Sequence, residues 1–292
     1  MPNLKEVRLR IASVNSTQQI TKAMKMVSAA KLRRAQNAIQ QLRPYANKLR
    51  DILENLSATL EESDGGQYAR VRPVNKVLIV AVSSNRGLAG AFNSNIIRTV
   101  NRMLNDQFAT QVKAGGVKVL CIGKKGSDFF SKNKQVYLGQ HNGIFANLGF
   151  DQVAEIAESI MADFAEAKYD QVVVVYNQFK NAAVQIVTTE QLLPIQPPAK
   201  TDSKMKNDYI FEPSKEEIVL ELIPKSIKTQ LYKAVLDSHA SEHGARMTAM
   251  NKATDNAGEL LKELRLSYNK ARQAAITNEI LEIVAGAEAL NG

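Results

Sequence analysis

The feature that most constrains this chain is a mostly apolar repeat, with a period near 3.5 residues, at both of its ends. The N-terminal series runs through Leu4, Val7, Ile11, Val14, Gln18, Thr21, Met24 and Val27 or Ser28, then Ala35, Ala38, Leu42, Tyr45, Leu49, Ile52, Leu56 and Leu60. This is the spacing of a coiled-coil seam. Pro44 is the one residue expected to kink this helix or to remove a hydrogen bond from it. At a rise of about 1.5 Å per residue, the helix is about 90 Å long, which no compact domain of this size needs.

The C-terminal end carries a second series of the same kind. It runs through Met247, Met250, Thr254, Ala257, Leu261, Leu264, Tyr268, Ala271 and Ala275, then shifts by one to Ile276, Ile280, Ile283 or Val284, and Ala287. Such a shift is typical of a stutter. Two long helices with one apolar stripe each can bury those stripes against each other. We therefore predict an antiparallel two-helix coiled coil formed by residues 1–62 and 214–290.

Gly244 lies inside the second predicted helix. Glycine in a helix interior costs up to about 1 kcal/mol relative to alanine. We expect close approach of a neighbouring backbone to explain its presence.

The segment between the two helices has the pattern of an α/β domain. Three short β-branched runs are typical of buried parallel strands: Lys76–Val82, Val117–Gly123 and Gln171–Asn177. A fourth run, Ala183–Leu193, follows too closely for a crossover, so it should return as an antiparallel edge strand. Helices are expected at Ala91–Phe108 and Gln152–Ala167, with a weaker one at Gly126–Ser131. The sequence thus predicts a Rossmann-like α/β domain at 75–195, inserted into the helical hairpin and followed by a linker at 196–213.

The formal net charge of +9 is concentrated at the N-terminal end. Residues 1–56 hold eleven Lys and Arg against three acids, so they carry nearly all of the excess. This distribution predicts an acidic partner, which is a nucleic acid, an anionic membrane surface or an acidic protein face, unless the residues simply form a solvated helix face. The single cysteine, Cys121, excludes an internal disulfide, and no apolar run reaches the roughly 20 residues of a membrane span.

Residues His239–His243 (HASEH) match the H-x-x-E-H pattern of inverted zinc peptidases, in which both histidines bind the metal and the glutamate is the general base. Such a site needs a third ligand from another element. The acids downstream lie on the same predicted helix, and Asp237 points away from the histidine face. A two-helix coil also has no walls for a peptidase cleft. The pattern therefore favours polar positions on a helix over a zinc site.

Other catalytic and nucleotide-binding patterns are incomplete. Ser83–Asn93 (SSNRGLAGAFN) follows a predicted strand, but Gly87 and Gly90 do not form a G-x-G-x-x-G fingerprint. Gly123–Phe130 lacks the spacing of a P-loop. His141 is expected in a glycine-rich loop with no obvious partner. We therefore predict no catalytic residue, no cofactor and no metal on this chain.

Long segments of the chain resemble the gamma subunit of F-type ATP synthases. Ile20–Gln36 (ITKAMKMVSAAKLRRAQ) resembles the N-terminal helix of that family, and Ile276–Ala289 (ITNEILEIVAGAEA) is similar to its C-terminal signature. Ser241–Ala257 and Ser83–Asn93 also match stretches typical of the family. The resemblance covers essentially the whole chain.

This resemblance implies a rotor shaft and not a catalyst. The helical hairpin would stand inside a ring of alpha and beta subunits that carry the nucleotide sites. The α/β domain would form a foot with the epsilon subunit on the membrane c-ring. The absence of a transit-peptide pattern before Leu4 favours a bacterial form, on the cytoplasmic face of the inner membrane.

Individual residues carry over from the family by position. Met24 corresponds to the position that faces an acidic helical segment of beta. The polar positions that engage the ring are Arg246, Arg272, Gln273, Thr277 and Glu279. Lys25, Lys31, Arg33 and Arg34 are added as basic neighbours from their charge alone. The segment near the c-ring includes Asp208, Tyr209 and Glu212, and the small, nearly uncharged final turns are expected to rotate in an apolar collar.

One alternative of another class is a coiled-coil scaffold or nucleic-acid-binding protein that uses the basic N-terminal arm on phosphates. Tyr45 is the only aromatic residue in residues 1–56, so stacking on bases has little support. Binding to DNA that falls steeply with salt would favour this alternative.

Overall fold

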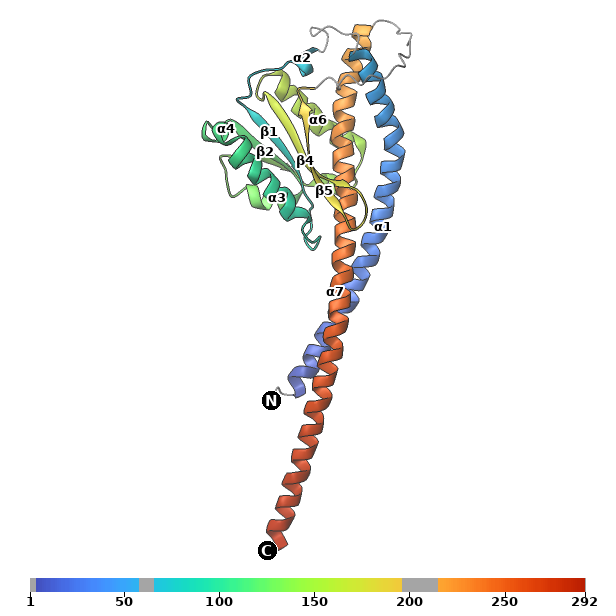
Figure 1. Cartoon of the computed structure of the whole chain (residues 1–292), viewed down its shortest axis with the longest axis vertical. Coiled ribbons are helices and arrows are strands. Elements are labelled where there is room, and N and C mark those ends of the chain that lie inside the picture. Colours follow the sequence, from blue (N-terminus) through green and yellow to red (C-terminus); the bar gives the residue numbers. More distant parts are fainter. Residues whose placement is uncertain (1–3, 58–65, 196–214, 292) are drawn as a thin grey trace. The chain divides into compact units, whose positions relative to one another are not determined.

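The computed structural model describes residues 4–57, 66–195 and 215–291, which form two long helices and a sheet domain (Figure 1). The long helices are α1 (Leu4–Ser57) and α7 (Lys215–Asn291). Between them the strands are β1 (Val77–Val82), β2 (Val117–Ile122), β3 (Tyr137–His141), β4 (Gln171–Phe179) and β5 (Gln185–Leu193). The other helices are α2 (Gly66–Ala69), α3 (Phe92–Arg102), the π-helix η1 (Met103–Gln107), α4 (Ala109–Lys113), α5 (Lys124–Phe130), the 3₁₀-helix η2 (Gly143–Phe145) and α6 (Phe150–Ala165). The predicted fold class is confirmed.

The chain packs as two compact units. The helical unit contains the residues up to Ser28 together with those from Met247 onward, and the sheet unit contains Ala29–Arg246. Each unit therefore includes part of α1 and part of α7. Packing divides the chain within the two long helices, whereas the sequence pattern divides it at their ends.

The sheet has the strand order β3-β2-β1-β4-β5, in which the first four strands are parallel and β5 is antiparallel to β4. The three predicted parallel strands and the predicted antiparallel edge strand are confirmed. β3 was missed, and the prediction of a loop at His141 is wrong, because His141 is the last residue of β3. β3 is a short edge strand without a fully buried residue, so it lacks the continuous apolar run that marks the inner strands.

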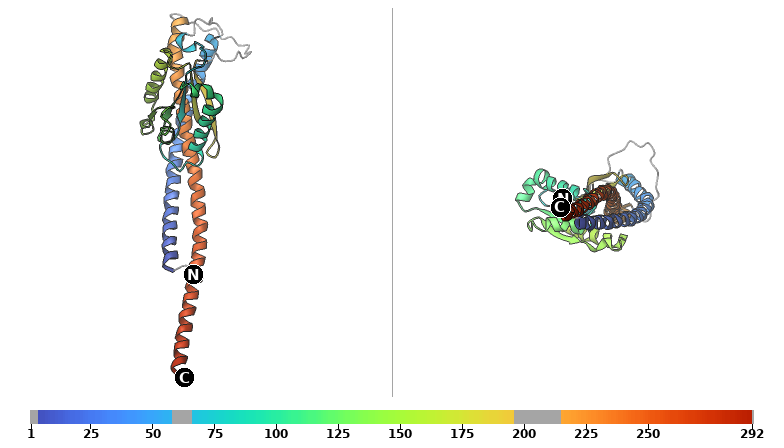
Figure 2. Two further views of the ribbon diagram at one scale, coloured as in Figure 1. Left: turned by 90° about the vertical axis from the view of Figure 1, so that its left-hand side faces the viewer. Right: turned by 90° about the horizontal axis from the view of Figure 1, so that it is seen from below.

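Alternate residues of the inner strands fill two separate cores, because successive side chains point to opposite faces of a sheet. On β1, Leu78, Val80 and Val82 belong to the core shared with α6 and α7. The other residues of β1 belong to the core shared with α3 and η1. Figure 1 and Figure 2 show α3 and α6 on opposite sides of the sheet. The residues of α7 in the first core are Ile223, Ile227, Leu231, Ala234 and Val235.

One predicted helix differs from the structure in detail. The segment predicted as one helix at Ala91–Phe108 is α3 followed by a π-helical turn, Met103–Gln107. Both Met103 and Leu104 of this turn are buried in the core beneath α3. Pro44 lies inside the continuous helix α1, and Pro224 likewise lies inside α7.

In the helical unit, α1 and α7 run antiparallel along the predicted seam. Lys25 donates a hydrogen bond to Asn251, and Thr254 donates to Thr21 over 2.9 Å. The later residue of α1 is therefore paired with the earlier residue of α7, as in an antiparallel pair. Buried seam residues are Val7, Thr21, Ser28, Met250, Ala257 and Leu261. The predicted seam position Tyr45, in the sheet unit, is exposed. Within the described residues, no helix contains an apolar stretch that could span a lipid bilayer.

Candidate partner interface

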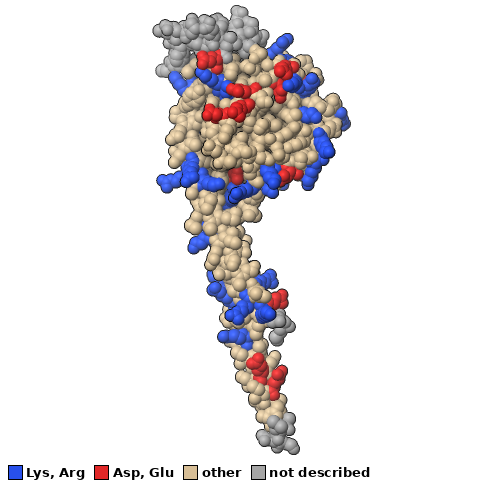
Figure 3. Space-filling view, turned by 180° about the vertical axis from the view of Figure 1, so that it is seen from behind, with Lys and Arg blue, Asp and Glu red and all other residues tan. Residues whose placement is uncertain are grey.

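The residues of α1 that are predicted to contact a partner are half-buried or exposed. Met24 and Lys25 are half-buried beside α7, and the Lys25 ammonium is held by the Asn251 side-chain oxygen. Lys31, Arg33 and Arg34 lie in the sheet unit and are exposed. Figure 3 shows Lys and Arg gathered along the paired helices of the helical unit, with acidic side chains nearer the C-terminal end of α7. The basic side chains of α1 can therefore contact an acidic partner at the surface.

The C-terminal end of α7 is exposed on every side. All described side chains from Ile276 to Glu288 are exposed, including Ile280, Leu281 and Ile283 at 55%, 60% and 71%. No Lys or Arg follows Arg272 in the sequence. Several large apolar side chains exposed together on one helix end, between Glu279 and Glu288, are typical of an interaction site. Among the predicted contacts, Arg272, Gln273, Thr277 and Glu279 are exposed on this part of α7.

Arg246, predicted as a contact of the same kind, is buried inside the sheet unit. Its side chain is 8% exposed and forms an ion pair of 2.7 Å with Glu242, whose side chain is 9% exposed. The guanidinium also donates to the backbone carbonyls of Arg86 over 3.2 Å and Gly87 over 3.3 Å. The spacing of Glu242 and Arg246, four residues apart on a helix, is the sequence signal that indicates this pair.

His239 and His243 face each other next to this ion pair, with their Nε2 atoms 3.1 Å apart. Arg246 can only donate, so Nδ1 of His243, 3.4 Å from the guanidinium, accepts. His243 therefore carries its proton on Nε2 and donates it to Nε2 of His239. The proton of His239 is then on Nδ1, which is buried without a hydrogen-bond partner among the described residues. The ring of Phe145 stacks on His239 at 5.8 Å.

Burial keeps both imidazoles neutral. Desolvation, followed by the charges of Lys31 and Arg246, lowers the pKa of His239 to about 4. Desolvation, followed by the neighbouring His239 and the same two cations, lowers the pKa of His243 to about 3. Burial acts in the opposite direction on the acids of this segment: it raises the pKa of Asp237 to about 6 and raises the pKa of Glu242.

These shifts predict that two of the chain's three histidines do not titrate above about pH 5. Because the unfolded chain binds protons near pH 6.5 and the folded chain does not, each histidine should reduce the free energy of unfolding as pH falls from 6.5 toward 4, by about 1.4 kcal/mol per pH unit. Asp237 and Glu242 oppose this loss, since a raised carboxyl pKa favours the folded state as pH falls. Histidine hydrogen–deuterium exchange at C2, followed by mass spectrometry, measures each midpoint separately. A midpoint near 6.5 for His239 or His243 would contradict the buried, neutral pair.

The prediction that this helix has no walls around the histidines is wrong, because the sheet unit packs around them. Phe145 covers His239, and the loop after β1 covers Arg246. Within the described residues, however, no group of three or more His, Cys, Asp or Glu is arranged to hold a metal ion. Glu242, the general base of the H-x-x-E-H pattern, is occupied by Arg246. The walls therefore enclose an ion pair and two neutral imidazoles.

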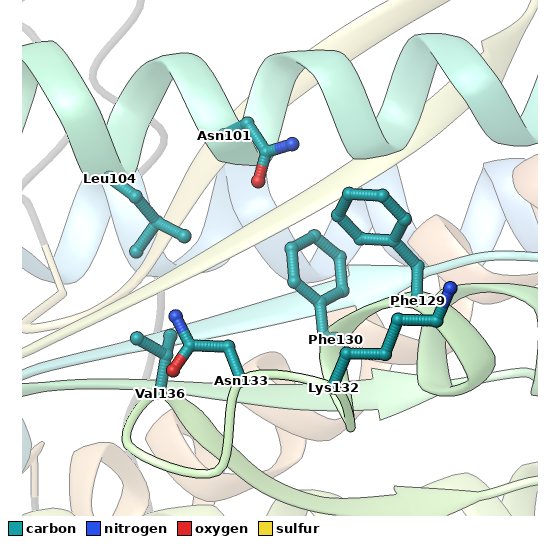
Figure 4. Close-up of a pocket in the computed structure, with 7 residues that line it drawn as sticks. All are labelled: Asn101, Leu104, Phe129, Phe130, Lys132, Asn133 and Val136. Atoms are coloured by element: carbon teal, nitrogen blue, oxygen red, sulfur yellow. The ribbon is translucent and has the colours of Figure 1, made fainter.

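Two shallow pockets lie elsewhere in the sheet unit, away from this cluster. One, of about 320 Å³, is lined by Leu104, Phe129, Phe130, Val136 and three polar residues (Figure 4). The other, of about 440 Å³, lies among Lys76, Lys118 and Lys168. Lys168 is paired with Asp163 and Glu166, and Lys118 donates to the Gln135 carbonyl, so two of the three ammonium groups are already bound. Neither pocket contains residues predicted to be functional.

The loop that matches SSNRGLAGAFN joins β1 to α3, and its polar groups bond within the chain. The Ser84 amide and hydroxyl both donate to the Asn93 side-chain oxygen. Leu88 and Gly90 have positive φ angles of 61° and 57°, and Leu88 is 66% exposed. The predicted foot residues Asp208, Tyr209 and Glu212 lie outside the described residues.

Comparison with known proteins gives consistent matches over the full length. A family model described as ATP synthase matches residues 3–290. The chain is 62% identical over 292 residues to the ATP synthase gamma chain of Flavobacterium johnsoniae and 48% identical over 290 residues to that of Chlorobaculum parvum, covering 99–100% of each.

Solved structures of ATP synthases also match this chain in fold. A central stalk/c-ring structure of the Tetrahymena thermophila mitochondrial ATP synthase matches with a TM-score of 0.60 and 28% identity, over 80% of this chain and 99% of that chain. A Euglena gracilis mitochondrial ATP synthase structure matches in fold with a TM-score of 0.69 and 21% identity, over 98% of this chain and 94% of that chain.

Proposed function

Because this chain belongs to the ATP synthase gamma chain family, we propose that it is the rotating central shaft of a proton- or sodium-translocating F-type ATP synthase. It transmits torque between a membrane c-ring and a catalytic ring of alpha and beta subunits. The observation that carries this function is the free end of α7, where every described side chain from Ile276 to Glu288 is exposed. The last described turns, Ile283–Glu288, are mostly apolar and carry a single charge, Glu288, so they suit rotation inside an apolar collar.

The helical unit suits a shaft in two further respects. A pair of long helices resists bending better than a loop-rich fold, and its seam includes polar contacts such as Thr254 to Thr21 that fix the register. The net positive charge of this unit lies on α1, because residues 4–28 hold five Lys and Arg against one acid, whereas residues 247–291 hold five against six acids. The pair therefore presents a different face in each orientation to three otherwise equivalent partners.

Specific contacts carry over from the gamma chain family by position. We assign Met24 to the position that faces an acidic helical segment of beta, with Lys25, Lys31, Arg33 and Arg34 as its basic surroundings. The polar contacts to the ring on α7 are Arg272, Gln273, Thr277 and Glu279. Asp208, Tyr209 and Glu212 form the contact with the c-ring.

The chain itself has no catalytic role in this proposal. The strand-to-helix turn at Gly87 and Gly90 lacks a nucleotide fingerprint, and nucleotide sites lie on the alpha and beta subunits. The epsilon subunit joins the sheet unit in the foot, and the assembly lies on the cytoplasmic face of a bacterial inner membrane as a peripheral complex.

Co-expression with alpha and beta subunits tests this function. We expect the three proteins to elute as one complex on size exclusion and to show ATPase activity that the chain alone lacks. If the chain does not join alpha and beta but binds DNA with an affinity that falls steeply with salt, the nucleic-acid alternative replaces the shaft.

Truncation after Glu282 tests the role of the free helix end. The free energy of unfolding of the isolated chain should change by less than about 0.5 kcal/mol, because the described side chains that it removes, from Ile283 to Glu288, are exposed. The complex should still assemble and hydrolyse ATP without load, whereas proton pumping against a gradient should fall. Truncation after Ala289 is the control. If most of the complex no longer assembled, while the complexes that did assemble rotated normally without load, this helix end would be an anchor. That result would contradict rotation of the end inside an apolar collar.

A further inference from the structure

The segment Asp237–Arg246 of α7 lies at the carboxyl ends of the parallel strands. Ser241 donates a hydrogen bond of 3.0 Å to the Asn177 carbonyl near the end of β4. Arg246 donates to two carbonyls of the loop after β1, and the ring of Phe145, in the turn after β3, stacks on His239. In open α/β sheets this edge usually holds the ligand. Here the chain's own helix occupies it.

The backbone of the β4–β5 turn approaches α7 closely at Gly244. A Cβ atom on Gly244 would lie 3.1 Å from the carbonyl oxygen and 3.2 Å from the Cα of Ala182. These distances are tighter than ordinary van der Waals contact, so glycine allows the helix to seat against the turn. The expected approach of another backbone to Gly244 is confirmed.

These contacts hold the helix from two sides. Gly244 and Arg246 are two residues apart, so in a helix with 3.6 residues per turn they project in nearly opposite directions. The β4–β5 turn meets one side and the loop after β1 meets the other. Apolar packing of α7 further toward its N-terminus is not directional, whereas hydrogen bonds to fixed carbonyls lose strength when the helix turns or slides.

The ion pair between Glu242 and Arg246 lies inside the sheet unit, between these two contacts. Glu242 and Arg246 are nearly buried, and the guanidinium joins the carboxylate to the carbonyls of Arg86 and Gly87. Arg246 is also the last residue of the compact sheet unit. Beyond it α7 continues in the helical unit, so the held part of the helix ends at this contact.

We propose that Asp237–Arg246 is the joint that makes α7 and the inserted sheet domain turn as one body, with Arg246 as a positioning residue inside the joint. This inference rests on the proposed shaft function and specifies where torque passes between the domain and the shaft. It also assigns Arg246 a partner within the chain instead of the surrounding ring.

Hydrogen exchange in the assembled wild-type ATP synthase tests the joint directly. We expect the amides of residues 237–246 to keep the same protection during ATP-driven rotation as in the inhibited complex. An increase in their exchange rate of more than about tenfold during turnover would show that this segment opens in each cycle, and would overturn the proposal.

Variants test the consequence for coupling, measured as protons pumped per ATP hydrolysed in the assembled complex. Arg246→Lys keeps a cation beside Glu242 but removes the planar fork that reaches both carbonyls. Gly244→Ala forces the β4–β5 turn away. Gly258→Ala is the matched control on the same helix, because its Cβ would meet only the flexible end of Gln18.

We expect the ratio to fall at least about twofold in Arg246→Lys and in Gly244→Ala, because a loosened joint lets the shaft slip, and to stay unchanged in Gly258→Ala. A variant that only folds less well yields fewer complexes with a normal ratio. That result in both variants would overturn the joint. If the wild-type chain supports no coupled pumping with its partners, the shaft function itself fails, which is a separate outcome.

Discussion

Replacing Arg246 with alanine should lower the free energy of unfolding of the isolated chain by about 3–5 kcal/mol, the usual cost of leaving a buried charge without its partner. The change removes the 2.7 Å ion pair to Glu242 and the donors to the Arg86 and Gly87 carbonyls. Glu242 would keep a nearly buried carboxylate without its cation. Urea unfolding followed by circular dichroism measures the difference.

Arg272→Ala is the matched control, because Arg272 lies on the same helix and is exposed. It should change the free energy of unfolding by less than about 0.5 kcal/mol. The double variant Arg246→Met with Glu242→Gln should recover part of the loss, since neutral groups of similar volume leave no buried charge behind. Equal effects of Arg246→Ala and Arg272→Ala would mean that the Arg246 side chain is solvated and would contradict its place in the joint.

The second large effect is expected for Leu231→Ala, which should lower the free energy of unfolding by about 2–5 kcal/mol. Leu231 is fully buried where α7 packs on the sheet, in one core with residues of β1, β4 and α6. Truncation to alanine loses the transfer free energy of the removed methyl groups and leaves a cavity. Thermal or urea unfolding of the isolated chain measures this effect.

Leu266→Ala makes the same chemical change on the same helix, at a side chain that is 62% exposed. It should change the free energy of unfolding by less than about 0.5 kcal/mol. A comparable loss for both leucines would show that α7 is packed alike along its whole length, contrary to the exposed C-terminal end. The contrast matters for function, because a shaft needs one part of α7 built into the domain and another free to meet a partner.

The two halves of α7 thus have different tasks. The first half supplies core residues of the sheet unit and, in our proposal, the joint to the inserted domain. The second half pairs with α1 through a seam that includes Thr254 and Met250, and then continues beyond its last half-buried residues near Ala275. In the proposed rotor, the first half receives torque from the foot and the second half delivers it to the ring.

The sequence by itself determined the local structure and the family. A 3.5-residue period predicts two long helices because burial of one helix stripe depends on spacing within that helix alone. Continuous apolar runs predict the inner strands for the same reason, and Gly244 indicates a close neighbour without naming it. The long matching segments, from Ile20–Gln36 to Ile276–Ala289, identify the gamma chain family, which the comparisons confirm.

The tertiary structure decided which helix faces are covered. In sequence, the polar segment from Asp237 to Arg246 has the pattern of a solvated surface, and Arg246 and Arg272 are equivalent cations on one helix. Arg246 is buried because carbonyls of Arg86 and Gly87, distant in the sequence, replace water as its acceptors, and Glu242 balances its charge. Leu231 and Leu266 differ for the same reason. Periodicity reports the contacts of a helix with its near neighbours, whereas burial of a polar group depends on which distant segments fold against it.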